Sequence, residues 1–283
     1  MKKTLVSATL IALGATPLMA AGHASVTGFG LAGEGKTLVT FADMSDPATH
    51  TTTDLTGGTL DAIAYRPVTG ELIGFSKSGM IYVVDPATGA LTDTGASFAD
   101  DATMGADAAV AFDFNNKIDA VRAVSSDGVN LVYFPGDFGG DKANTIKRFT
   151  DLAYAEGDAN AGATPMVFAN GYTNAVNGAK QDSTFQYALD SGTDALLSLA
   201  NNAGTLATIA PLTLDGKAVD VSAMGGMEIV SGGADDNSAM ALLSMEGQES
   251  AGLYAIDLDT GALSLMGDTG MGGFTGFAAM MGN

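Results

Sequence analysis

Short runs of β-forming residues alternate with turn residues along nearly the whole chain. The stretch Leu60 to Gly95 shows this most clearly, because four such runs are separated by turn chemistry at Pro67 to Gly70, Ser76 to Gly79 and Pro86 to Gly89. This pattern is typical of an antiparallel four-stranded meander. The stretch therefore predicts one structural unit that the rest of the chain can repeat.

The remaining sequence contains further copies of this unit, expected at residues 108–150, 166–209 and 224–266. The clearest match aligns MIYVVDPATGALTDTG, which begins at Met80, with GLYAIDLDTGALSLMGDTG, which begins at Gly252. The equivalent Tyr82 and Tyr254 lie 172 residues apart, or about four periods of roughly 43 residues, a spacing typical of propeller blades. The repeats favour a propeller over a sandwich.

The two ends of the chain provide incomplete units that complement each other. Ser25 to Leu55 contains only three predicted strands, and Phe274 to Met281 is a single leftover strand. Pairing the two would close a ring and cover exposed sheet edges. We therefore predict an all-β fold, a single β-propeller with five four-stranded blades. Six blades is the alternative, because strands are hard to count in Val176 to Ser183 and Gly232 to Ser238.

The first 24 residues have the layout of a secretory signal peptide. Lys2 and Lys3 precede an apolar run from Leu5 to Leu13, and small residues follow at Ala20 and Ala21. The alternative is a buried N-terminal strand or helix. We expect a signal peptide at residues 1–24, a propeller domain at residues 25–283, and a periplasmic or extracellular location.

The chain is strongly acidic, with 32 Asp and Glu against 12 Lys and Arg and a formal charge of −20. Without Lys2 and Lys3 the charge becomes −22, which argues against nucleic acid or anionic lipid as a partner. The alternative is that the charge only keeps the protein soluble. No later stretch predicts insertion into a membrane. The chain has no cysteine, which excludes thiol catalysis and zinc–thiolate or iron–sulfur sites.

Four segments resemble, in order, the successive motifs of a bacterial exported family, domain of unknown function 4394. They are LDAIAYRPVTGELIGF, VAFDFNNKIDAVRAVSSDGVNLVYFP, DANAGATPMVFANGYTNAV and NNAGTLATIAPL, at residues 60–75, 110–135, 158–176 and 201–212. The resemblance covers nearly the whole chain after residue 24. It implies a propeller-like fold and implies no particular activity.

Carboxylates are the only abundant reactive groups, since the two histidines, His23 and His50, cannot supply a multi-histidine metal site and make a Ser-His-Asp triad an unfavourable interpretation. A glycosidase would need two carboxylates about 5–10 Å apart across the channel. Asp61, Asp107 and Glu228 are the candidates, because they lie at the starts of, or within, predicted inner strands. The alternative is that they only hydrate the channel.

Two long acidic loops are expected at the funnel mouth, Gly95 to Asp107 and Thr150 to Pro165. Their oxygen donors suit a hard cation such as Ca²⁺, which takes about six to eight oxygen ligands. The candidate ligands are Asp100, Asp101, Asp158 and Asn160. The alternative is that these side chains cap turns.

Arg66 and Arg122 stand in or after strands of an otherwise acidic protein. They could hold an anionic substrate, or pair with neighbouring aspartates. Together the features favour a non-enzymatic exported module that binds an unknown protein or a small-molecule or carbohydrate ligand, with a divalent cation at the funnel mouth. The alternative is a calcium-dependent hydrolase, glycosidase-like or lactonase-like, and the oligomeric state stays open.

Overall fold

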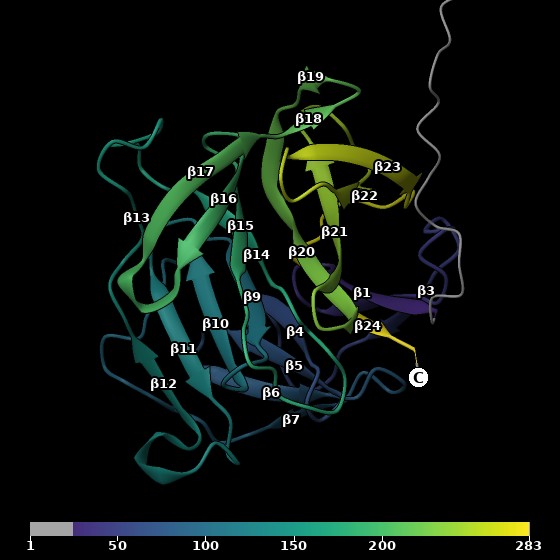
Figure 1. Ribbon diagram of the computed structural model, residues 1–283. Coiled ribbons are helices and arrows are strands. Elements are labelled where there is room, and N and C mark those ends of the chain that lie inside the picture. Colours follow the sequence, from purple (N-terminus) through teal and green to yellow (C-terminus); the bar gives the residue numbers. More distant parts are fainter. Residues whose placement is uncertain (1–24, 283) are drawn as a thin grey trace, which may run out of the picture.

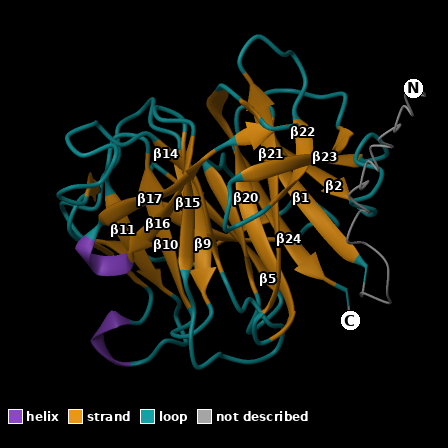
Figure 2. Cartoon of the chain, turned by 45° about the horizontal axis from the view of Figure 1, so that its top comes forward, coloured by secondary structure: helices purple, strands orange, loops and turns teal. Residues whose placement is uncertain are grey.

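The computed structural model describes residues 25–282, which form five mainly antiparallel sheets arranged as the blades of one ring (Figure 1). This confirms the predicted all-β propeller with five blades. The predicted signal peptide lies outside the described residues. Strands and loops make up nearly all of the structure, and the helical part of residues 25–282 is limited to two short turns (Figure 2), Gly140–Lys142 and Asn201–Ala203. Within the same residues no helix is long and apolar enough to cross a membrane.

The blades follow one another along the chain, and each extends from an inner strand at the axis of the ring to an outer strand at the rim. Blade 1 contains β24 (Gly276–Met281), β1 (Val26–Ala32), β2 (Thr37–Phe41) and β3 (Thr51–Asp54). Blade 2 contains β4 (Ala62–Arg66), β5 (Glu71–Ser76), β6 (Met80–Val84) and β7 (Leu91–Asp93). Blade 3 contains β9 (Val110–Asn115), β10 (Ala120–Ser125), β11 (Asn130–Phe134), β12 (Thr145–Arg148) and β8 (Ser97–Phe98).

The last two blades are larger. Blade 4 contains β14 (Val167–Tyr172), β15 (Gln186–Asp190), β16 (Ala195–Ala200), β17 (Thr205–Pro211) and β13 (Ala153–Tyr154). Blade 5 contains β20 (Val221–Gly233), β21 (Asp236–Met245), β22 (Gly252–Ile256), β23 (Ala262–Asp268), β18 (Thr213–Leu214) and β19 (Lys217–Ala218).

The ring is closed by the C-terminal strand, as the sequence predicts. β24 pairs antiparallel with β1, with Gly28 opposite Ala279 and Leu31 opposite Gly276. Blade 1 therefore takes its inner strand from one end of the chain and its other three from the opposite end. Because the two ends of the chain share one blade, the first and last blades pack against each other and neither has an uncovered face.

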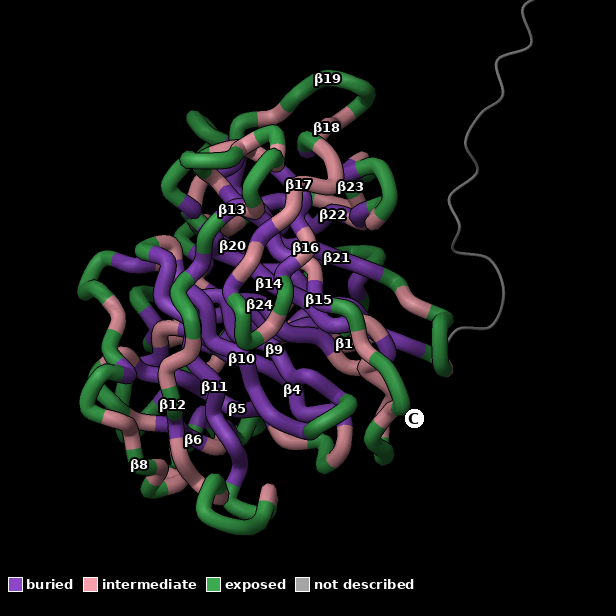
Figure 3. The backbone as a smooth tube through the Cα atoms, turned by 60° about the vertical axis from the view of Figure 1, so that its left-hand side comes forward, coloured by how far each residue is buried: buried purple, intermediate pink, exposed green. Residues whose placement is uncertain are grey.

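The hydrophobic core is divided among the five contacts between neighbouring blades. Each contact has its own buried cluster, and that between blades 2 and 3 contains Phe75, Phe112 and Phe114. Four further clusters join blades 4 and 5, 5 and 1, 1 and 2, and 3 and 4, and a small sixth cluster lies within blade 3. Buried residues accordingly follow the inner strands, while exposed residues follow the rim loops (Figure 3).

The prediction of four strands in every blade is wrong for blades 3, 4 and 5. The segment that leads into each of these blades first runs along its outer edge and adds a short parallel strand there. These strands, β8, β13 and β18, are only two residues long, so no alternation of polar and apolar residues marks them. The equivalent segment leading into blade 2 forms only one parallel bridge, from Thr56 to Ala90.

One backbone hydrogen bond repeats at these edges and explains the repeated Thr-Gly-Ala-Leu turn. The amides of Thr56, Ala153 and Thr213 donate to the carbonyls of Gly89, Gly204 and Gly261, at 2.9, 3.0 and 3.2 Å. In blade 3 the amide of Ser97 donates to Asn144 at 2.9 Å. All four acceptor residues have positive φ. A Cβ at Gly89 would lie 2.1 Å from the carbonyl oxygen of Asp54, so the approaching segment requires glycine there.

The two segments behind the six-blade alternative do not add a blade. Residues 173–185 form the loop between β14 and β15, whereas Gly232 to Ser238 belongs to the turn and ends of the long β20–β21 hairpin. The hairpin is long because β20 spans 13 residues. The six-blade alternative is therefore wrong.

Candidate functional site

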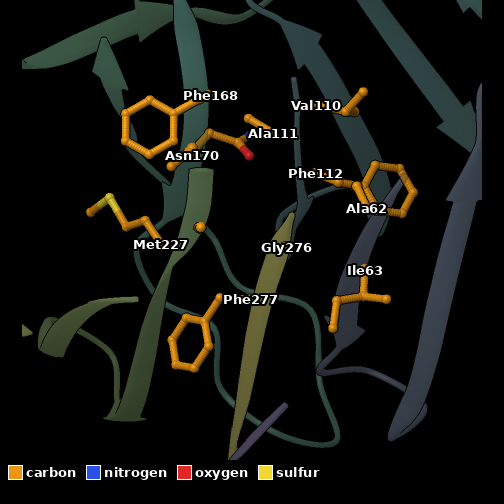
Figure 4. A pocket seen from close by; sticks show the side chains of 13 residues that line it. Ala62, Ile63, Val110, Ala111, Phe112, Phe168, Asn170, Met227, Gly276 and Phe277 are labelled. Atoms are coloured by element: carbon orange, nitrogen blue, oxygen red, sulfur yellow. The ribbon is translucent and has the colours of Figure 1, made fainter. Parts of the chain in front are cut away.

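All five inner strands converge on one small cavity at the axis of the ring. It is lined by Ala62 and Ile63 of β4, Val110, Ala111 and Phe112 of β9, Phe168, Ala169 and Asn170 of β14, Gly225, Gly226 and Met227 of β20, and Gly276 and Phe277 of β24 (Figure 4). Most of these residues lie near the beginnings of their strands. The cavity therefore occupies that end of the channel, and it is partly open to solvent.

The lining of the cavity carries no charge, and it is apolar apart from one side-chain amide. Figure 4 shows the side chain of Asn170, a residue of β14, close to Ala111 of β9. The Asn170 side chain is 1% exposed. Neither its Nδ2 nor its Oδ1 has a hydrogen-bond partner in the protein, which is costly for a buried amide.

The opposite end of the channel is covered by the loop of residues 173–185. This loop hydrogen bonds to the four blades other than its own: Gly178 N to Pro67 O at 2.8 Å, Gln181 N to Asn116 O at 3.1 Å, Ala175 N to Ser231 Oγ at 2.9 Å, and Asn177 Nδ2 to Met281 O at 2.9 Å. All of these partners lie at or just after the ends of inner strands. The channel is thus a blind funnel and not a pore.

Asn116 is the main attachment of this loop. It is fully buried, and its Nδ2 donates to the carbonyls of Asn174, Val176 and Ala179 at 2.9, 3.2 and 3.1 Å. One side chain of blade 3 therefore holds three peptide carbonyls of the loop. Contacts of this kind fix an irregular segment that has no ladder of its own.

Two buried carboxylates join neighbouring inner strands, each one residue further along its strand than the cavity lining. Asp113 of β9 accepts the amide of Phe114 at 2.7 Å and, across the blade boundary, that of Tyr172 at 2.6 Å. Glu228 of β20 accepts the amides of Ile229 at 3.0 Å and Ala279 at 3.3 Å. In both cases one bond is to the next residue and one to the neighbouring inner strand. These acids thus satisfy amides at the axis, where inner strands have no further strand to pair with.

The same burial changes the protonation of both acids. Burial raises the pKa of Asp113 to about 8, against the lowering effect of its two amide donors. Burial, and then repulsion by Asp113, raises the pKa of Glu228 well above its ordinary value. A buried carboxylate with no cation beside it retains its proton into the neutral range. We therefore assign the pair a structural role at the axis.

The structure does not bring the three predicted catalytic acids together. Asp61 accepts the backbone amide of Lys77 at 2.7 Å and lies 3.3 Å from its Nζ. Asp107 is exposed, and Glu228 is buried between β20 and β24. Asp61 is held by a salt bridge, and Glu228 is electrostatically coupled to Asp113, which is not among the acids predicted from the sequence.

The four predicted calcium ligands lie on the outer side of two different blades. Asp101 accepts from Arg148 of outer strand β12 through its backbone carbonyl at 3.2 Å, and Asp100 is its exposed neighbour. Asp158 accepts the amide and hydroxyl of Thr208 on outer strand β17, each at 2.7 Å, and the amide of Asn160 at 2.8 Å. These residues therefore lie at the outer edges of blades 3 and 4, because their connections first follow the blade edges. Across residues 25–282 no group of three or more His, Cys, Asp or Glu side chains could hold a metal ion.

The two candidate arginines have different surroundings. Arg66 is buried and forms ion pairs with Asp119 and Asp137, each at 2.6 Å, and with Glu71 at 3.0 Å. These contacts join blades 2 and 3 and engage its guanidinium with carboxylates.

Arg122 is also buried, but its hydrogen bonds go to neutral acceptors. It donates to Tyr172 Oη at 3.0 Å, Asn130 Oδ1 at 2.5 Å and Asn202 Oδ1 at 2.8 Å. Arg122 thereby links blades 3 and 4. Arg122 therefore lies beside the Tyr172 hydroxyl and does not line the cavity.

Three residues of the channel are not predicted from the sequence: Asp113, Asn116 and Asn170. Asp113 had a detectable signal, since a single acid inside an apolar inner strand recurs at Glu228. Asn116 and Asn170 had none, because asparagine beside glycine or another asparagine also indicates an ordinary turn.

The comparisons with known proteins identify a family. Residues 37–278 match the family model described as Domain of unknown function (DUF4394). No curated protein matches the chain. Similar solved structures include hydrazine synthase of Kuenenia stuttgartiensis, with 15% identity, a TM-score of 0.40 and coverage of 76% of this chain and 50% of that one.

Two further structures come from Bacteroides. A protein of unknown function from Bacteroides caccae has 8% identity, a TM-score of 0.40 and coverage of 90% and 98% of the two chains. An auxiliary nutrient binding protein from Bacteroides thetaiotaomicron has 14% identity, a TM-score of 0.43 and coverage of 75% and 55%. The chain spans about half the length of the hydrazine synthase chain.

Proposed function

We propose a binding function for this chain, which belongs to the DUF4394 family over residues 37–278: it is an exported propeller that takes a ligand at the open end of its axial cavity. One observation carries the proposal. All five blades converge on the cavity, and the loop of residues 173–185 closes the other end. Export is supported by the predicted signal peptide.

The dimensions and lining of the funnel limit the ligand. The cavity volume open to the centre of a water molecule is about 10 Å³, far below the roughly 300–1,000 Å³ of sites for drug-sized molecules. No charged side chain lines it. The ligand is therefore a small uncharged molecule, or one uncharged group of a larger one.

The sequence-based alternatives have weaker support. No contact among the described residues favours a hydrolase, because Asp61, Asp107 and Glu228 lie in separate environments. The divalent cation would require Asp158, whose two oxygens already accept three hydrogen bonds. Thermal unfolding with calcium against chelator tests the cation.

A thermal-shift screen of small neutral metabolites tests the proposed function. The comparison is between wild type and Ala111→Leu, which adds three carbons beside Asn170, with the exposed rim variant Asp100→Asn as the matched control. We expect some compounds to raise the midpoint of wild type and Asp100→Asn but not of Ala111→Leu, since only native-state binding stabilises. Shifts that survive Ala111→Leu, or no shift with any compound, would contradict the proposal.

A further inference from the structure

Asn170 is the one polar side chain that the axial cavity presents to a ligand. The residue is 1% exposed, and both of its polar side-chain atoms lack a hydrogen-bond partner in the protein. The other residues that line the cavity, such as Ala111 and Phe277, offer no side-chain donor or acceptor (Figure 4). An amide in such surroundings gains free energy from any group that pairs with it.

The pairing group must be neutral and must both donate and accept. Asn170 presents a donor at Nδ2 and an acceptor at Oδ1. A cation would satisfy only Oδ1, and an ionised carboxylate only Nδ2. Either charge would also be buried among apolar residues, which is costly without a counter-charge.

The cavity is also too small for most polar groups. The space in which the centre of a water molecule can lie amounts to about 10 Å³, which is about the minimum that admits one water molecule. A primary amide or a carboxylic acid would bring two polar heavy atoms side by side. A single hydroxyl oxygen has the required size and both hydrogen-bonding functions.

We propose that Asn170 anchors one hydroxyl oxygen at the propeller axis. In the free protein this oxygen belongs to a fixed water molecule, and in the complex it belongs to a hydroxyl of a small polyol or monosaccharide. The rest of such a ligand extends out of the cavity through its side open to solvent. The second half of this proposal rests on the proposed function and names its ligand class.

Two experiments test the site. The first is a high-resolution crystal structure of wild type, grown without polyols, in which we expect an ordered oxygen within about 3.2 Å of Asn170 Nδ2 or Oδ1. The second is a thermal-shift titration with glycerol, myo-inositol and D-glucose, with 1,2-dimethoxyethane as a hydroxyl-free control. It compares wild type with Asn170→Leu, which keeps the approximate shape of the side chain but removes both polar atoms, and with Ala111→Leu.

We expect at least one polyol to raise the midpoint of wild type, the hydroxyl-free ether to have no effect, and Asn170→Leu to lose at least three quarters of the shift. An empty cavity in the crystal would by itself overturn the whole inference. An ordered water without any polyol shift would overturn the ligand class.

The remaining outcome separates this inference from the proposed function. A polyol shift that survives Asn170→Leu but disappears in Ala111→Leu would overturn the role of Asn170 and leave the axial site standing. If neutral compounds other than polyols bind in an Ala111→Leu-sensitive way, the proposed function holds and the hydroxyl class fails. Because the crystal of wild type needs no variant, misfolding of Asn170→Leu cannot rescue the proposal.

Discussion

At the rim, blades 2, 3, 4 and 5 repeat the same backbone hydrogen bond, whereas at the axis the polar side chains differ from one inner strand to another. The rim bond joins an incoming segment to a positive-φ residue such as Gly89 or Gly261. At the axis, β9 and β20 supply buried acids and β14 supplies an unpartnered amide. The rim thus builds any blade, while the axis distinguishes this propeller from others built in the same way.

Blade 1 sharpens the contrast. Among residues 25–282 its outer strand β3 is not covered by an incoming segment, and its residues are mostly exposed. Its inner strand comes from the C-terminal end of the chain. The repeat is therefore interrupted where the ring closes, because the connection into β24 comes from blade 5 and does not follow β3.

The largest expected effect is at the rim, where substitution of equivalent glycines should cost similar amounts of unfolding free energy. Gly89→Ala and Gly261→Ala each place a Cβ within 2.6 Å of a backbone oxygen at positive φ. We expect each to lower the free energy of unfolding by about 2–3 kcal/mol, measured by denaturant titration.

Gly79→Ala is the matched control, because Gly79 also has positive φ but meets no atom within 4 Å. It should cost only about 1 kcal/mol. If Gly79→Ala were as costly as the other two, the cost of a positive φ would alone explain all three losses of stability. The close approach of the incoming segment would then not matter.

The next effect is at the closed end of the axis. Asn116→Ala removes one donor from three carbonyls of the loop of residues 173–185, and we expect a loss of about 2 kcal/mol. Hydrogen exchange should also become faster across residues 173–185, with Lys117→Ala as the exposed control. Unchanged exchange in the loop would show that Asn116 does not hold it.

A smaller effect is expected from the buried acids, whose protonation should make the free energy of unfolding depend on pH. In the folded protein the pKa of Asp113 is raised to about 8, so the folded state retains a proton that the unfolded state releases near pH 4. Its stabilising effect is fully present below about pH 4 and is lost as the pH rises towards 8, by at most about 1.4 kcal/mol per pH unit.

Denaturant titrations at pH 5, 6, 7 and 8 measure this slope. Asp113→Asn should make it shallower, even though the variant is less stable at pH 6 because its amide opposes one of the two amide donors. The exposed variant Asp107→Asn should leave the slope unchanged. Equal slopes in wild type and Asp113→Asn would mean that Asp113 is ionised in the folded protein at neutral pH.

The smallest expected effect concerns calcium at the rim. Adding calcium or a chelator should move the thermal midpoint by less than about 1 °C, because a cation bound only to the native state is required for a shift and Asp158 is already occupied by Thr208 and Asn160. A rise that Asp158→Asn abolishes would restore the predicted cation site.

The sequence by itself determined the parts of the structure that depend on neighbouring residues. Strand alternation and turn chemistry located the four strands of Leu60 to Gly95, and the echo of Thr88-Gly89 at Thr260-Gly261 showed that blades repeat. Counting strands at both ends was enough to predict the ring closure through β24. Periodicity and turn types are local properties, so one chain suffices to read them.

Only the tertiary structure decided which side chains share the axis and which lie at the rim. Asp107, Asp158 and Glu228 look alike in sequence, yet the structure exposes the first, engages the second at a blade edge and buries the third between two inner strands. Asn170 acquires its unpartnered amide only because five strands from distant parts of the chain meet around it. Burial and pairing at the axis depend on contacts between residues far apart in sequence, which local patterns do not record.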